Sequence, residues 1–108
     1  MELAGHISNA GAQPVLYLSG EIDLSTLPLL RDLLTRLVHE HPRATVRADL
    51  DGVTSLDDTG IGILLGVAAL ARSLGGELEV FSSPGRIRER LTATRTDLAV
   101  TVHPAATA

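Results

Sequence analysis

The chain has 108 residues, a net charge of −4 and a hydrophobic content of 44%. Its length is that of one domain, and its composition is that of a globular protein rather than a disordered one. The negative charge and the scarcity of aromatic residues, limited to Tyr17 and Phe81, argue against nucleic-acid binding, which uses basic surfaces and stacking platforms. The chain has no cysteine, which excludes disulfides, thiol switches and cysteine-based metal sites.

The first half of the chain predicts a β-hairpin followed by a helix. Apolar and polar residues alternate over 13–19, which indicates a strand. The Asn-Ala-Gly turn before it predicts pairing with an earlier strand at 3–8. Ser25 or Thr26 can cap the next helix, whose leucines recur at helical spacing. A His-Pro pair at 41–42 ends that helix.

The second half of the chain alternates strands with helices. The predicted elements are a strand at 45–50, a helix from Asp58 to the glycine pair 75–76, a strand at 77–81, a helix at 86–94 and a strand at 98–102. The full order is β-β-α-β-α-β-α-β. Strands that alternate with helices are joined by right-handed crossovers, so we predict an α/β fold with a mixed, mostly parallel sheet. We expect one domain over 1–103 and a C-terminal tail at 104–108.

Acidic and hydroxyl side chains gather where the second helix begins, at Asp57-Asp58-Thr59-Gly60. A helix start carries unpaired N–H groups and about half a unit of positive charge, so it can hold, or mimic, a phosphate. Asp is among the best N-cap residues, and we predict that Asp58 caps this helix. For Asp57 the purely structural interpretation is a loop carboxylate that accepts backbone N–H groups; the alternative is a role in shaping a binding site.

Two motifs resemble those of the anti-sigma factor antagonists, the small bacterial STAS domains. In that family a strand ends Asp-Leu-x-x-Val, and Asp-Ser-Ser/Thr-Gly then opens a helix. The matching residues here are Asp49, Leu50, Val53, Asp57, Thr59 and Gly60. Upstream, Gly20-Glu21-Ile22-Asp23 resembles the family's Gly-Glu-hydrophobic-Asp, which ends the second strand. The resemblance covers nearly the whole chain and implies the STAS fold.

The resemblance also implies a function. Such antagonists are non-enzymatic regulators that bind an anti-sigma factor with serine-protein kinase activity and so free a sigma factor, and we expect no cofactor in this chain. We also expect a cytoplasmic protein without membrane insertion, because the N-terminal residues lack the pattern of a signal peptide and the longest apolar run, 61–71, is too short to span a bilayer. This mechanism is called partner switching. The implied partner-binding residues are Glu21, Asp23, Asp57, Asp58, Thr59, Gly60, Ile61 and Gly62. We expect the exposed side of the helix at 61–67 to add apolar contact, the two glycines to admit a partner's backbone, and the chain to be a monomer or weak dimer.

One position departs from the family pattern. The residue that the kinase phosphorylates in the family is a serine, and this chain has Asp58 in its place. A carboxylate is not a substrate for Ser/Thr phosphorylation, so we expect this control to be lost or altered. As a partial mimic of phosphoserine, Asp58 would fix the state that releases the partner. If the partner tolerates one charge, Asp58 would instead leave the chain permanently active. Thr59 is an alternative acceptor, although one residue turns a helical side chain by about 100°.

No basic residue lies between Arg47 and Arg72, a stretch that carries Asp49, Asp51, Asp57 and Asp58. Together with Glu21 and Asp23 these acids would form one acidic pole if the two motifs lie side by side. Such a pole suits a partner with a basic face; the alternative is a solvated surface of unimportant acids.

The main alternative is a STAS interaction subunit of a membrane lipid-transport ATPase. A metal site at Asp57 and Asp58 is not expected, because adjacent acids make a poor cage by themselves. Nucleotide hydrolysis by Asp57, Asp58 and Thr59 lacks a nearby base to hold a phosphate.

Overall fold

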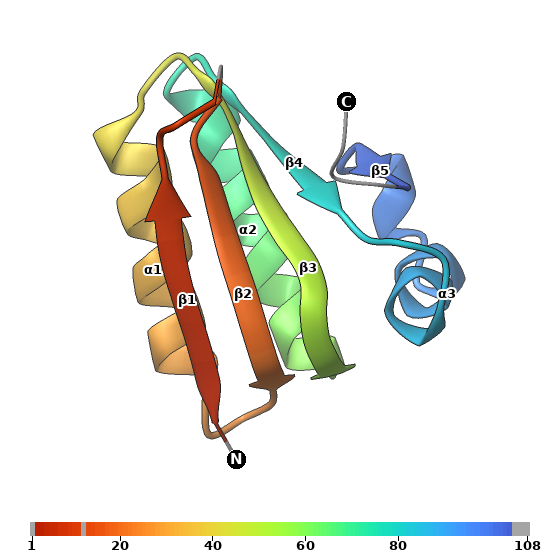
Figure 1. Cartoon of the computed structure of the whole chain (residues 1–108). Coiled ribbons are helices and arrows are strands. Elements are labelled where there is room, and N and C mark those ends of the chain that lie inside the picture. The colour runs from red at the N-terminus through yellow and green to blue at the C-terminus, as the bar shows by residue number, and fades with distance from the viewer. Residues whose placement is uncertain (1, 12, 105–108) are drawn as a thin grey trace.

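One five-stranded sheet with helices packed on it accounts for residues 2–11 and 13–104, which the computed structural model describes (Figure 1). The elements are β1 (Leu3–Ser8), β2 (Val15–Ile22), α1 (Leu27–Glu40), β3 (Thr45–Leu56), α2 (Asp58–Ser73), β4 (Glu77–Phe81), α3 (Arg86–Ala93), a 3₁₀ turn η1 (Thr96–Leu98) and β5 (Val102–His103). The strand order is β1-β2-β3-β4-β5, with β1 antiparallel to β2 and the other pairs parallel. The predicted α/β fold and element order are confirmed.

The core lies between the sheet and the two long helices. In β2, Leu16, Leu18 and Ile22 are buried while Tyr17 and Ser19 are exposed, which is the alternation expected of a strand with one covered face. The buried face of α1 supplies Leu30, Leu33, Leu34, Leu37 and Val38. Both long helices lie on the same face of the sheet, behind it in Figure 1, and in the described part of the chain the face in front of β1, β2 and β3 carries no helix.

The third strand is longer than the predicted strand at 45–50. It continues to Leu56 through Asp51 and Gly52, which are typical turn residues. Along this extension β3 stays paired with β2, and two irregularities in register, one between Tyr17 and Ser19 and one between Gly20 and Glu21, accommodate the continued ladder. Pairing with a neighbouring strand therefore overrides the local turn preference.

The strand predicted at 98–102 is mostly wrong. Residues 96–98 form η1, and only Val102 and His103 pair with β4. Arg95 has a positive φ of 60°, which turns the chain sharply after α3 and prevents an extended run. Of the predicted tail, only Pro104 lies within the described residues.

The first helix begins after Thr26, but no hydrogen bond from the Thr26 side chain caps it. That hydroxyl instead donates to the carbonyl of Glu21, at 2.9 Å, and accepts the N–H of Asp23, at 3.0 Å. The predicted capping by the Thr26 side chain is wrong because the turn after β2 uses its hydroxyl.

Two glycines of α2 provide a matched pair for testing the packing. A Cβ at Gly60 would collide with Ile22 and lie 3.0 Å from Leu56, whereas a Cβ at Gly66 would meet nothing within 4 Å. We expect Gly60→Ala to lower the free energy of unfolding by about 1–3 kcal/mol, as overpacking does. We expect Gly66→Ala to raise it by roughly 0.5–1 kcal/mol through helix propensity. Urea unfolding measures both, and equal effects of the two variants would contradict this packing.

Candidate functional site

The two motifs meet where β2 and β3 end. Ile22 pairs with Leu56 in the parallel ladder, and the N–H of Asp57 donates to the carbonyl of Ile22 at 3.2 Å. The hydroxyl of Thr54 reaches the carbonyl of Gly20 at 3.3 Å. Figure 1 shows both strand ends at the bottom of the view, beside the start of α2. We call the surface formed by Glu21, Asp23, Asp57 and Asp58 the acidic edge.

Asp57, and not Asp58, caps α2. Its Oδ1 accepts the N–H of Gly60 at 3.0 Å and the hydroxyl of Thr59 at 2.5 Å. The Thr59 hydroxyl and the Gly60 N–H together hold the pKa of the Asp57 carboxyl below its ordinary value, because both bonds favour the charged form. The Thr59 hydroxyl therefore helps to hold the Asp57 carboxylate in its capping position. The interpretation of Asp57 as an acceptor of backbone N–H is confirmed.

Asp58 is the first helical residue, which corrects the prediction that it is the N-cap. Its side chain is 84% exposed, and Oδ1 lies 2.5 Å from Nη2 of Arg90 on α3. A base therefore lies beside the acidic edge, contrary to the expectation from the local charge pattern. The spacing of 32 residues between the two partners carries no local signal, and only the packing of α3 brings them together.

Glu21 and Asp23 shape the turn that follows β2. Both are partly buried. Asp23 Oδ1 accepts the N–H and the hydroxyl of Ser25, at 2.9 and 2.6 Å, while the carbonyl of Glu21 accepts the Thr26 hydroxyl. These two acids therefore belong to a hydrogen-bonded turn, a common place for such residues, and they also lie at the acidic edge.

The first turns of α2 divide into buried and exposed positions. Gly60 is buried against Ile22, and Ile61 is 6% exposed, so the missing Cβ of Gly60 serves packing within the domain rather than the approach of a partner. Gly62 is exposed, as its predicted role requires. Together with Ile63 and Gly66 it lines a cleft of about 250 Å³ between α2 and α1.

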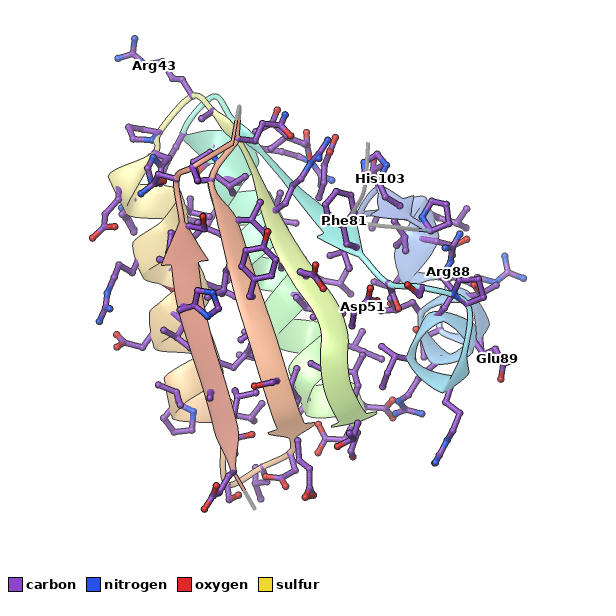
Figure 2. All side chains as sticks on the ribbon, in the orientation of Figure 1. Arg43, Asp51, Phe81, Arg88, Glu89 and His103 are labelled. Carbon is purple, nitrogen blue, oxygen red and sulfur yellow. The ribbon has the colours of Figure 1, made fainter. Side chains whose placement is uncertain are left out.

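Two of the predicted acids lie away from this edge. Asp51 accepts the N–H and the hydroxyl of Ser83, at 2.8 and 2.9 Å; Figure 2 shows it extending from β3 toward the loop that leads into α3. Asp49 is 6% exposed and pairs in register with Tyr17 and Phe81, so strand alternation turns it away from α1 and α2. The acidic pole is therefore smaller than predicted.

A groove separates the end of β3 from α3. Thr54, Ser55, Leu56 and Asp57 line one side of it, and Arg86, Ile87 and Arg90 line the other, around a cavity of about 250 Å³. Among residues 2–11 and 13–104, no three His, Asp or Glu side chains are arranged to hold a metal ion. No helix in the same part of the chain is long and apolar enough to cross a bilayer. What the acidic edge offers is charge, hydroxyl groups and shape for binding.

The cap can be tested by two substitutions of Asp57. Asp57→Ala should lower the free energy of unfolding by about 0.5–2 kcal/mol, and Asp57→Asn should change it little, because Asn caps as well as Asp. Because the pKa of Asp57 is lower in the native state than in the unfolded chain, its ionised carboxylate stabilises the fold at pH values above the unfolded pKa, about 3.9. This contribution is lost as pH falls through the native pKa, and the Asn variant should lack that part of the pH dependence. Urea unfolding from pH 2 to 7 measures both effects, and an Asn variant as unstable as the Ala variant would count against the cap.

The buried acid should show the opposite pH dependence. Burial raises the pKa of Asp49, so the native state holds its proton more tightly than the unfolded chain does. The contribution of this residue to stability should therefore fall as pH rises from about 3.9 through the native pKa. We expect Asp49→Asn, which keeps an acceptor for the Asp51 N–H, to be more stable than wild type at pH 7. Their difference should shrink in acid, and a less stable Asn variant at pH 7 would overturn this assignment.

Comparisons with known proteins agree with this architecture. A family model described as "Mlab, STAS domain" matches residues 6–101. The anti-sigma-B factor antagonist of Bacillus subtilis is 33% identical over 63 residues. That match covers 58% of this chain and 56% of the relative, so the aligned stretch spans little more than half of the relative's length.

Solved structures share the fold. An anti-sigma factor antagonist from Mycobacterium paratuberculosis superposes with a TM-score of 0.86 at 24% identity, over 97% of this chain and 88% of that one. SpoIIAA, an anti-sigma factor antagonist in its unphosphorylated form, gives 0.72 at 15% identity, over 92% and 87%. The phosphorylated form of the Bacillus SpoIIAA gives 0.66 at 15% identity, over 92% and 90%. With the family match running from residue 6 to residue 101 and the same fold over nearly the whole chain, this protein belongs to the STAS domain family.

Proposed function

We propose that this protein is an anti-sigma factor antagonist that acts in the cytoplasm by docking on an anti-sigma factor with serine-protein kinase activity. The observation that carries the proposal is the position of Asp58. This residue stands where the family pattern has its phosphorylated serine, and it lies exposed at the start of α2 beside the ends of β2 and β3. The likeness to the anti-sigma-B factor antagonist of Bacillus subtilis supports the same function.

The geometry supports docking rather than catalysis. Asp58, Thr59 and Gly62 are exposed along the start of α2, so a partner can reach them without rearrangement of the fold. The cleft at Ile63 and Gly66 adds apolar surface next to this charge, and interfaces combine an apolar centre with a polar rim. In this proposal the chain needs no cofactor, and the kinase supplies the Mg-ATP.

Control by phosphorylation is altered in this proposal. The solved structures of SpoIIAA include a phosphorylated and an unphosphorylated form, and the family pattern has a serine where this chain has Asp58. A carboxylate does not accept the phosphate. The neighbouring hydroxyl of Thr59 donates to Asp57, which favours its role in the cap over a role as an alternative acceptor.

The competing proposal is a STAS interaction subunit of a membrane lipid-transport ATPase. The matching family model carries the description "Mlab, STAS domain" and not that of a sigma regulator. This candidate predicts a different partner, so a copurification experiment separates the two. Affinity-tagged wild-type protein would bring down the ATP-binding subunit of a transporter instead of an anti-sigma factor.

Binding to the anti-sigma kinases of the same organism tests the main proposal. We expect wild type to bind at least one of them, with or without ATP, by isothermal titration calorimetry. Asp58→Ser should bind without ATP and lose roughly tenfold or more in affinity once ATP allows phosphorylation, since the phosphate adds a charge of about −1.5 to −2. Mass spectrometry should find the phosphate on residue 58 of the variant only.

Asp32→Asn is the matched control, because it removes the same charge from an exposed position on α1. It should bind as wild type does, with and without ATP. Failure of wild type and Asp58→Ser to bind any such kinase would refute the proposal. Phosphorylation of Thr59 in wild type would refute the altered control.

A further inference from the structure

We infer that Arg90 is an internal counter-ion for position 58, which neutralises Asp58 and keeps the acidic edge in its partner-binding state. The inference rests on the proposed function and adds a residue that neither motif contains. It also decides between the two consequences left open for Asp58, a permanently released state and a permanently active one. The pairing of Asp58 with a base on α3 favours the active state.

The position of Arg90 is set by the packing of α3. The next residue, Leu91, is fully buried in the core, and Arg88 donates to the carbonyl of Ser82 at 3.1 Å. Asp51 also ties the preceding loop to β3 through Ser83. Because α3 is held at both its core side and its start, the Arg90 guanidinium is brought to the start of α2 by the fold.

The guanidinium depends on Asp58 for its hydrogen bonding. Arg90 Nη2 lies 2.5 Å from Asp58 Oδ1, and the Arg90 side chain is 38% exposed. Its Nε is buried and, within the described residues, has no hydrogen-bond partner. A charged group that is partly desolvated and incompletely paired gains more from a carboxylate than a fully solvated one does.

The pair changes what a partner meets at position 58. An unpaired Asp would add a full negative charge next to Asp57, and phosphoserine would add about −1.5 to −2. The single positive charge of Arg90 balances the single negative charge of Asp58, whereas it would balance only part of the charge of a phosphoserine in the same place. The influence of Arg90 also extends to Asp57, whose pKa its positive charge helps to lower. The acidic edge therefore differs from a phosphorylated one even though an acid replaces the serine.

The pair itself can be tested in the isolated protein. We expect Arg90→Gln and Asp58→Asn each to speed amide hydrogen exchange in α3 by about twofold to fivefold, as loss of one surface ion pair allows. The double variant should be no faster than the singles, because both substitutions remove one interaction. Arg95→Gln, which removes an exposed charge just beyond α3, should leave this exchange unchanged.

The consequence for binding is tested with the kinase that wild type binds. Arg90→Gln leaves Asp58 unpaired and should weaken binding roughly tenfold, because an unmatched charge at an interface is penalised. Adding Asp58→Asn to Arg90→Gln should recover most of that loss. Arg95→Gln should bind as wild type does.

The outcomes separate this inference from the proposed function. If wild type binds a kinase and Arg90→Gln binds it equally tightly or more tightly, the counter-ion inference is wrong and the proposed function stands. If the exchange rates of α3 do not respond to either single variant, the pair does not form in solution and the inference is also wrong. If no variant binds any kinase, the proposed function fails, and the inference about the binding state fails with it.

Discussion

Parallel pairing of β2 with β3 is the constraint on which the rest of the site depends. The two strands end together, with Ile22 opposite Leu56, and α2 begins at the next residue but one. Helix starts that follow parallel strands lie at the same edge of a sheet, so a residue at the start of α2 lies beside the turn after β2. Gly60 allows the close approach, because any side chain there would strike Ile22. The acidic edge is thus a product of strand register.

Two adjacent carboxylates at this edge have different roles because of helix geometry. The N-cap side chain folds over the free N–H groups of the first turn, whereas the side chain of the first helical residue projects outward. The Asp57 carboxylate therefore accepts the Gly60 N–H of the helix backbone, whereas the Asp58 carboxylate lies exposed on the surface. A serine at position 58 would occupy the same exposed place, so exchanging serine and aspartate here would leave the cap intact and change only the surface.

The late elements of the chain complete the surface. Asp51 anchors the loop before α3, and α3 carries Arg90 to Asp58. On the side of β4 away from this edge, Glu79 Oε1 lies 3.3 Å from Arg47 Nε and 2.9 Å from His103 Nε2. Figure 2 shows His103 beside Phe81, the residue over whose ring Arg47 lies. Short side-chain contacts, rather than a long strand, hold β5 to the sheet.

Local patterns in the sequence were sufficient for the fold class, the order of elements and the place where a helix opens on acids and hydroxyl groups. These features depend on short-range signals, namely the alternation in β2, the leucine face of α1 and the motifs around Glu21 and Asp57. The alternation and the leucine face can be read from one sequence because each reflects burial of one face of its element. The edges of elements were less predictable. Asp51 and Gly52 favour a turn in isolation, yet they continue β3 because β2 lies alongside.

Tertiary structure alone decided which acids lie together and which basic residue pairs with them. Asp49, Asp51, Asp57 and Asp58 are close in sequence, but burial takes Asp49 away, Ser83 engages Asp51, and only the last two lie at the acidic edge. The pairing of Asp58 with Arg90 joins residues 32 apart. Such a contact depends on how α3 packs against β3. That packing is made by many buried apolar side chains, and their pattern in the sequence does not indicate which charged residues they bring together.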